Sequence, residues 1–268
     1  MIDSKRDSNP PAEHHRSQPP CRCELDWGLP GASEAASRGD IVVLVDTLSF
    51  STCVVAAVHG GAVIYPCADR SEGAELARSY GAELAVRRVD VPLKGRFSLS
   101  PLTYLDITPG TRIVLPSPNG SACSQAAAQA GRLFLGAFVN AAAVASVVSQ
   151  ELRKIEQEKS VTVIACGERV TSEGTITDPM RFAAEDYLGA GAILSYLPFD
   201  KSPLARRCEA AYLHSRDRID RILLNCQSGR ECRSLGFGRD VEFASRLNSL
   251  NSVPVLREGH FERIEAQR

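Results

Sequence analysis

The sequence lacks long hydrophobic runs and an excess of charge of either sign. No apolar stretch approaches the ~20 residues of a membrane span, and Met1 is followed by charged and polar residues instead of a secretory signal core. The 31 basic and 32 acidic side chains leave a net charge of -1. This balance excludes a global attraction to nucleic acid or membrane. We therefore expect a cytoplasmic protein with no nucleic-acid or membrane partner that binds a small molecule.

Several familiar motifs are also missing. The nine cysteines lack repeated Cys-x-x-Cys spacing, so we expect free thiols and no zinc cage. There is no Gly-x-x-x-x-Gly-Lys-Ser/Thr or Gly-x-Gly-x-x-Gly loop. An Asp-x-Asp phosphatase pattern would need an aspartate at Leu48, and no cysteine has an arginine six residues later. These absences exclude the commonest nucleotide-binding and phosphatase signatures.

The composition divides the chain into a tail and a domain. Residues 1–20 contain four prolines and few apolar side chains, so we expect a disordered tail. Residues 21–268 have ample length for a single α/β domain, and a division into two lobes stays open.

Short apolar runs alternate with helix-like segments through most of this domain. The run Ile41 to Val45 is continuous and mostly β-branched, which is typical of a strand buried on both faces of a parallel sheet. Pro254 places the last expected strand, 253–256, at an edge or in an irregular segment. Gly189 and Gly191, inside an expected helix, predict close packing by a strand or a ligand. The alternation implies right-handed βαβ crossovers. We expect further strands at 62–65, 83–86, 113–115, 132–139 and 161–165, and helices at 53–59, 71–80, 122–130, 141–156, 182–196, 204–214 and 239–247.

A turn at residues 116–121 connects an expected strand to a small-residue helix. Asn119 and Gly120 tolerate positive φ, and Ser121 can cap the helix. Several backbone N–H groups should then point into one small space, which suits an anion such as phosphate.

Acidic side chains follow two of the other expected strands. Asp46 ends the first, and Glu168 with Arg169 follows 161–165. Ligands of parallel sheets bind beyond the carboxyl ends of strands, and carboxylates beside a phosphate site suit Mg²⁺. Asp46 could instead cap a helix, and Glu168 with Arg169 could be an exposed pair. Glu185 and Asp186 lie ~100° apart on their helix, so the choice between them as ligand or base stays open.

Five short segments, in this order along the chain, resemble the 2-phosphosulfolactate phosphatase family, the ComB-like proteins. The segments are Val43 to Thr52, Pro116 to Ser121, Ala165 to Arg169, Glu185 to Ile193 and Leu235 to Phe243. The resemblance implies a three-layer α/β/α fold with a largely parallel or mixed sheet. It also implies a Mg²⁺-dependent phosphoric monoester hydrolase that converts 2-phospho-3-sulfolactate, a small phosphorylated acid, to 3-sulfolactate and phosphate. A homo-oligomer stays open.

The resemblance implies a metal and phosphate site formed by Asp46, Asn119, Gly120, Ser121, Glu168 and the Glu185–Asp186 pair. Our own interpretation of the sequence adds Arg169 and Ser51. The expected catalytic residues are Asp46, Glu168 and Asp186, and the expected metal ligands are Asp46, Glu168 and Glu185. The expected substrate-binding residues are Asn119, Gly120, Ser121, Arg169 and Ser51. Arg169 would supply positive charge for the transition state.

One position departs from the family pattern. Ser49 stands where better-known members have arginine three residues after the aspartate. Losing a guanidinium from a site for a polyanionic substrate should change its anion affinity. Two alternatives therefore stay open: a phosphatase for a different phospho-acid, and a non-catalytic sensor or binder of phosphorylated or sulfonated small acids.

Overall fold

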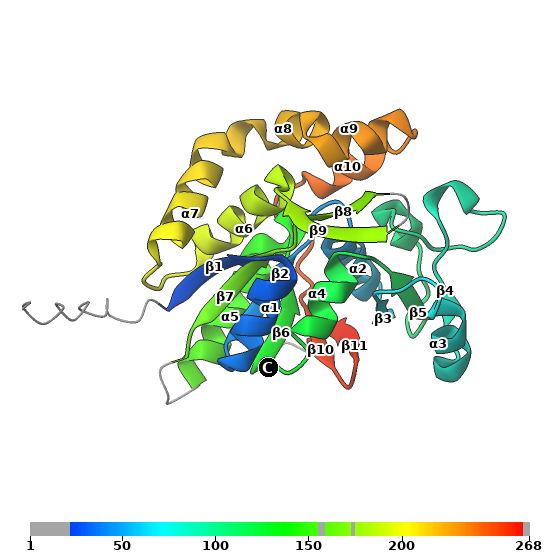
Figure 1. Cartoon of the computed structure of the whole chain (residues 1–268), viewed down its shortest axis with the longest axis horizontal. Coiled ribbons are helices and arrows are strands. Elements are labelled where there is room, and N and C mark those ends of the chain that lie inside the picture. The colour runs from blue at the N-terminus through cyan, green and yellow to red at the C-terminus, as the bar shows by residue number, and fades with distance from the viewer. Residues whose placement is uncertain (1–21, 155–158, 173–174, 265–268) are drawn as a thin grey trace, which may run out of the picture.

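A central sheet with helices on both faces forms the core of the molecule (Figure 1). The computed structural model describes residues 22–154, 159–172 and 175–264, so the expected tail at 1–20 lies outside the described residues. The large sheet has nine strands. This architecture confirms the predicted three-layer α/β/α class.

Two blocks of parallel strands are joined in the middle of the sheet by an antiparallel hairpin. The strand order is β1-β7-β2-β6-β10-β11-β3-β5-β4. Strand β10 runs antiparallel to β6, and β11 runs antiparallel to β3. A separate two-stranded sheet pairs β8 with β9. The strands are β1 (Cys23–Trp27), β2 (Ile41–Val45), β3 (Val63–Cys67), β4 (Glu83–Leu84), β5 (Arg112–Pro116), β6 (Arg132–Leu135), β7 (Val161–Ala165), β8 (Glu168–Ser172), β9 (Thr175–Arg181), β10 (Pro254–Arg257) and β11 (His260–Arg263).

The expectation that Pro254 marks an edge strand or an irregular segment is wrong. Strand β10 lies inside the sheet, between β6 and β11. Pro254 is its first residue, and only Val255 pairs with β6, opposite Phe134. A proline is tolerated at the first residue of a strand, where its missing N–H interrupts no ladder.

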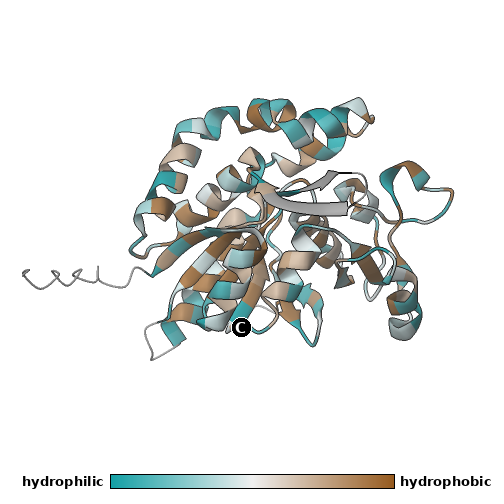
Figure 2. Cartoon of the chain, viewed as in Figure 1, coloured by the Kyte–Doolittle hydropathy of each residue, from teal (hydrophilic) through white to brown (hydrophobic). Residues whose placement is uncertain are grey.

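The helices cover both faces of the sheet. Helices α1, α2 and α4 pack on one face, and α5, α6 and α7 pack on the other. Strand β2 alternates between the two cores: Val43 packs with the second group and Leu44 with the first. Figure 2 shows brown, apolar strands between helices whose outer faces are teal. The α-helices are α1 (Gly28–Ser37), α2 (Phe50–His59), α3 (Gly73–Tyr80), α4 (Gly120–Ala126), α5 (Ala141–Lys154), α6 (Ala184–Tyr196), α7 (Pro203–Ser215), α8 (Ile219–Asn225), α9 (Gln227–Ser234) and α10 (Gly238–Ala244).

Four 3-10 helices complete the described elements: η1 (Arg88–Asp90), η2 (Pro101–Tyr104), η3 (Phe138–Asn140) and η4 (Arg216–Arg218). Within the described ranges, no helix combines the length and the apolarity needed to cross a membrane.

Close backbone packing explains the two glycines inside α6. A Cβ on Gly189 would lie 2.8 Å from Thr47 Oγ1 and 3.0 Å from Val45 Cγ1. A Cβ on Gly191 would lie 2.5 Å from the carbonyl oxygen of Cys208 in α7. The close neighbours are therefore the end of β2 and a helix. The contact with Thr47 brings the first turn of α6 against the residues that follow β2.

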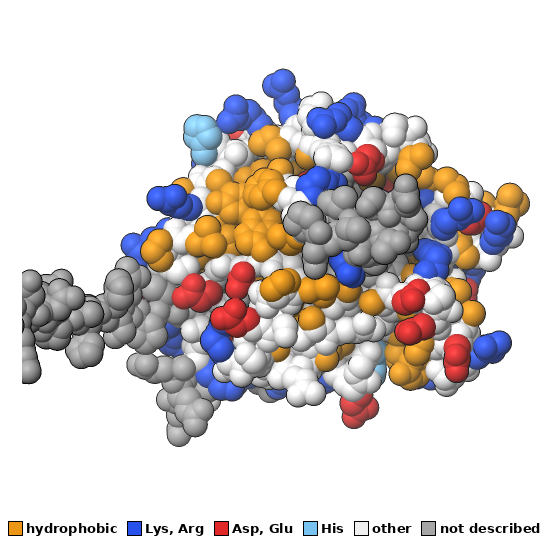
Figure 3. Space-filling view, in the orientation of Figure 1, with side chains coloured by type: hydrophobic (Ala, Val, Ile, Leu, Met, Phe, Trp, Pro, Cys, Tyr) orange, Lys and Arg blue, Asp and Glu red, His pale blue; other side chains and the backbone are white. Residues whose placement is uncertain are grey.

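An aromatic cluster ties β1 to the segment between β9 and α6. The rings of Trp27 and Phe182 lie 5.1 Å apart, and Tyr187 stacks on Trp27 at 5.8 Å. Phe182 is 56% exposed, and Figure 3 shows an apolar patch in the region where β1, α6 and α7 meet. This cluster anchors the end of β9 on the main sheet.

Gly120 packs against Phe50 at the start of α2, and we predict that Gly120→Ala destabilises the protein. A Cβ there would lie 2.3 Å from Phe50 Cδ1 and 2.7 Å from Asp46 Oδ2. Phe50 is fully buried and cannot move aside. Overpacking of this kind costs about 1–3 kcal/mol, and urea unfolding measures it.

Gly238 provides the matched control, because it also begins a seven-residue helix. A Cβ there would meet only Arg233 Cγ, at 3.4 Å. Gly238→Ala should leave the unfolding free energy unchanged or slightly higher. Equal losses in the two variants would contradict the packing argument.

Candidate active site

Three turns from separate parts of the chain meet at one end of the sheet. Asp46 follows β2, and Gly167 follows the neighbouring parallel strand β7. Strand β5 lies far from β2 in the sheet, but the turn after it leads into α4, which packs against α1 and β2. The predicted convergence of these strand ends is therefore observed, although β5 is not a neighbour of β2.

Asp46 links two of these turns through its carboxylate. Its Oδ1 accepts a hydrogen bond from the Phe50 N–H at 3.1 Å, and its Oδ2 accepts one from the Gly120 N–H at 2.9 Å. The side chain is 5% exposed. The carboxylate thus caps the start of α2 and also receives an N–H of the turn at 116–121, which the sequence assigned to an external anion.

Asp186 forms the corresponding link to the third turn. Its Oδ1 accepts from the Thr47 N–H at 2.8 Å, and its Oδ2 accepts from the Gly167 N–H at 2.9 Å. Glu185 contacts the turn after β2 through its backbone, because its carbonyl oxygen accepts a hydrogen bond from Thr47 Oγ1 at 3.1 Å. Both acids are buried in the first turn of α6. Asp186 is engaged on both oxygens, so Glu185 is the better candidate of the two for binding a ligand.

Glu168 is held by the turn at 116–121. Its Oε2 accepts from Asn119 Nδ2 at 2.8 Å, and Asn119 Oδ1 accepts from the Arg169 N–H at 3.1 Å. Arg169 Nη1 lies 3.4 Å from the Pro118 carbonyl oxygen, while its Nε is buried and has no hydrogen-bond partner among the residues that the structure describes. Asn119 therefore holds the Glu168 carboxylate and the backbone of Arg169 together.

The two serines of the expected substrate site are fully buried and engaged within the protein. Ser51 Oγ accepts from the Asp46 N–H at 3.0 Å and donates to the Leu44 carbonyl at 3.3 Å. Ser121 Oγ donates to the Leu115 carbonyl at 3.0 Å. These hydroxyls shape the turns around the site.

Four carboxylates share this small region, and burial makes their charges costly. Burial, with Glu185 nearby, raises the pKa of Asp46 from 3.8 to about 6. Burial and the charge of Asp46 raise the pKa of Glu168 from 4.5 to about 7. The same causes raise the pKa of Asp186 well above its ordinary value. Nearby cations would favour the charged forms of all these groups.

The donor chemistry fits a hard divalent cation. Within the described residues, no group of three or more His, Cys, Asp and Glu side chains forms a ready metal cage. Mg²⁺ usually takes only one or two protein carboxylates and completes its shell with water and substrate phosphate. Glu168 and Glu185 offer such carboxylates, while the oxygens of Asp46 and Asp186 already accept backbone N–H groups.

A guanidinium that the sequence reasoning missed also reaches the site. Arg88, in η1, donates from Nη2 to Ser49 Oγ. Its Nε lies 3.3 Å from Oδ2 of Asp240 in α10, and Asp240 Oδ1 accepts from Ser100 Oγ at 2.6 Å. No spacing rule connects residues so far apart. The signal that could have pointed to this contact was the family resemblance of the Leu235 to Phe243 segment, which contains Asp240.

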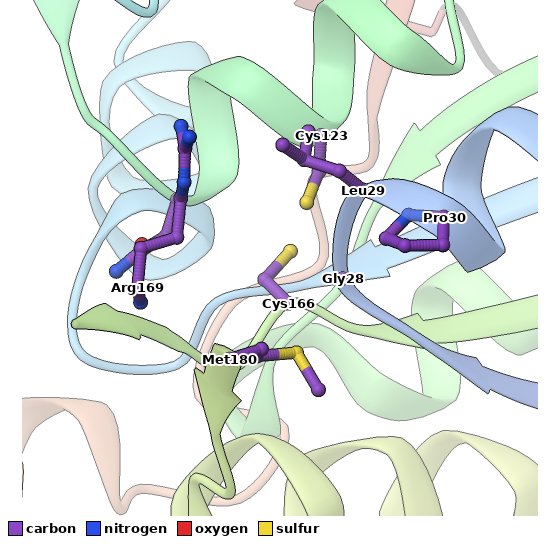
Figure 4. Close-up of a pocket in the computed structure, with 8 residues that line it drawn as sticks. Gly28, Leu29, Pro30, Cys123, Cys166, Arg169 and Met180 are labelled. Atoms are coloured by element: carbon purple, nitrogen blue, oxygen red, sulfur yellow. The ribbon is translucent and has the colours of Figure 1, made fainter. Parts of the chain in front are cut away.

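A small cavity opens beside Asn119 and Arg169 (Figure 4). Its volume is about 80 Å³. The thiols of Cys123 and Cys166 face each other in it, with Met180 close by. The remaining lining residues are Gly28, Leu29 and Pro30. The cavity thus places an apolar space next to the polar side chains held by Asn119.

Comparison with known proteins identifies one family. The family model described as 2-phosphosulpholactate phosphatase matches residues 29–259. A probable 2-phosphosulfolactate phosphatase of Carboxydothermus hydrogenoformans is 33% identical over 227 residues, covering 82% of this chain and 87% of the relative. The 2-phosphosulfolactate phosphatase of Methanothermobacter thermautotrophicus is 28% identical over 237 residues, covering 88% and 95%. That of Methanocaldococcus jannaschii is 26% identical over 227 residues, covering 82% and 90%.

The raised pKa of Glu168 predicts a specific pH dependence of stability in metal-free protein. The folded protein holds the Glu168 proton up to a pH of about 7, whereas the ordinary pKa is 4.5. This contribution is fully present below pH 4.5 and is lost as the pH rises through 7. Glu168→Gln should therefore increase the unfolding free energy by about 1–3 kcal/mol at pH 8 and have little effect at pH 4.

Urea unfolding in chelator across this pH range measures the difference. Glutamine keeps an oxygen that can accept from Asn119, so the hydrogen bond is preserved. Exposed Glu242 supplies the control Glu242→Gln, which should follow the wild-type pH curve. If the unfolding free energy of Glu168→Gln changed with pH in the same way as that of the wild type, burial of the Glu168 charge would have no cost.

Proposed function

The chain belongs to the 2-phosphosulfolactate phosphatase family, and from this we propose that it hydrolyses 2-phospho-3-sulfolactate to 3-sulfolactate and phosphate. The family match covers residues 29–259, which include Asp46, Asn119, Glu168, Arg169 and the Glu185–Asp186 pair. The observation that supports the proposal best is the meeting of Asp46, Asn119 and Glu168 at one end of the sheet. Such an end is where α/β folds bind ligands.

A phosphatase of this family is expected to use a metal ion, and we propose Mg²⁺. Glu168 and Glu185 would hold it, with Asp46 beside them. Bound Mg²⁺ would polarise the phosphoryl group and lower the pKa of a water molecule.

The chain's own residues bind and orient the substrate in this proposal. Arg169 faces the phosphate with its positive charge, which stabilises the negative charge that develops in the transition state. Asn119 holds the Glu168 carboxylate and the backbone of Arg169. Asp186 acts indirectly, because its carboxylate keeps the turns at Thr47 and Gly167 together.

We predict Mg²⁺-dependent phosphate release from 2-phosphosulfolactate, abolished by chelator and restored by added Mg²⁺. Glu168→Gln and Asp46→Asn should each lower kcat by about 100-fold or more, because each removes a charge from the reaction centre. A steady-state phosphate-release assay measures both effects. Glu242→Gln should retain wild-type activity.

The same assay, run on a panel of small phospho-acids, separates the alternatives. Release from another phospho-acid in preference to 2-phosphosulfolactate would assign a different substrate, an outcome that Ser49 keeps open. Binding of 3-sulfolactate without release from any ester would indicate a sensor. Full activity of both site variants with normal Mg²⁺ dependence would refute the proposed catalytic roles.

A further inference from the structure

Arg88 brings a guanidinium to the turn that carries Asp46. It belongs to η1 and donates from Nη2 to the hydroxyl of Ser49, 39 residues earlier in the chain. Ser49 is the N-cap residue of the ten-residue helix α2. The charge reaches the site, because Ser49 precedes Phe50, whose N–H donates to the Asp46 carboxylate at 3.1 Å.

The guanidinium is held in place but keeps donors free. Its Nε lies 3.3 Å from Asp240 Oδ2, yet both atoms are buried without a hydrogen bond to any residue in the described part of the chain. Among the residues that the structure describes, Nη1 has no hydrogen-bond partner. The Arg88 side chain is 21% exposed. A guanidinium has five N–H donors and pairs with anions in a planar, two-point geometry, so Arg88 retains the capacity to bind one more anion.

The surroundings of Arg88 position it without neutralising it fully. The Phe237 ring lies 5.8 Å from the guanidinium carbon and supports the planar group. Asp240 also accepts a hydrogen bond from Ser100, at 2.6 Å, so its charge is shared between two donors.

We propose that Arg88 binds the second anionic group of the substrate, the carboxylate or sulfonate carried next to the phosphate ester. This inference rests on the proposed function and adds a specificity residue to it. Asp46 lies between two regions: Asn119 and Glu168 on the Gly120 side, and Ser49 with Arg88 on the Phe50 side. A substrate with its phosphate on the first side places a further anion toward Arg88.

The test compares Arg88→Ala with Arg87→Ala. Arg87 is the adjacent arginine, it is 64% exposed, and it pairs with Asp90 at the surface, so its variant removes the same charge from the same segment. Each protein is titrated with 3-sulfolactate, which carries two anionic groups, and with inorganic phosphate, both as inhibitors of phosphate release and by calorimetry. Ionic strength is held constant.

Arg88→Ala should weaken 3-sulfolactate binding by about 10- to 100-fold, the usual effect of losing a charge-assisted pair. It should change phosphate binding by less than about 2-fold, whereas a structural defect would weaken both ligands together. Arg88→Lys keeps the charge beside Asp240 and serves if the alanine variant unfolds. Its loss of 3-sulfolactate affinity should be intermediate, because an ammonium lacks the two-point geometry.

The outcomes separate the two levels of the proposal. Equal 3-sulfolactate affinities in the Arg88 and Arg87 variants, with wild-type hydrolysis of 2-phosphosulfolactate intact, would overturn the role of Arg88 alone. Parallel weakening of both ligands in Arg88→Lys would also overturn it. No hydrolysis and no 3-sulfolactate binding by the wild-type protein would overturn the proposed function, and this inference with it.

Discussion

The candidate site depends on one carboxylate that accepts two backbone N–H groups. Asp46 joins the start of α2 to the start of α4 through Phe50 and Gly120, and Asp186 repeats the arrangement between Thr47 and Gly167. Each acid is buried, so the two backbone donors offset part of the cost of removing its charge from water. The turns that carry Asn119 and Glu168 are therefore held by charged groups, and the site depends on them for its shape.

The charges of the site are divided between acids and guanidinium groups from distant segments. Arg169 lies beside the turn at Asn119, and Arg88 reaches Ser49 from η1. Position 49 is where we expect an arginine in better-known family members; this chain has Ser49 there, whose hydroxyl accepts a hydrogen bond from Arg88.

Much of the fold could be predicted, because local patterns decide it. Continuous apolar runs identified β2 and β7, the ordered motifs identified the family, and strand ends located the acids. The position of β10 could not be predicted, since Pro254 argues locally against an interior strand and only pairing with β11 shows how it is tolerated. Helices α8 and α9 were also missed. The Arg88–Asp240 contact could not be predicted either, because no spacing in the sequence relates the two segments that it joins.

The place of the β10–β11 hairpin has a consequence for how the chain assembles on the ribosome. No strand of one parallel block pairs with a strand of the other, because the β10–β11 hairpin, which follows all the other strands in the chain, lies between them. The sheet therefore cannot close until the last strands have emerged. Contacts between such distant segments slow folding, and until the hairpin pairs with β6 and β3 each block exposes an unpaired strand edge, which is prone to aggregation.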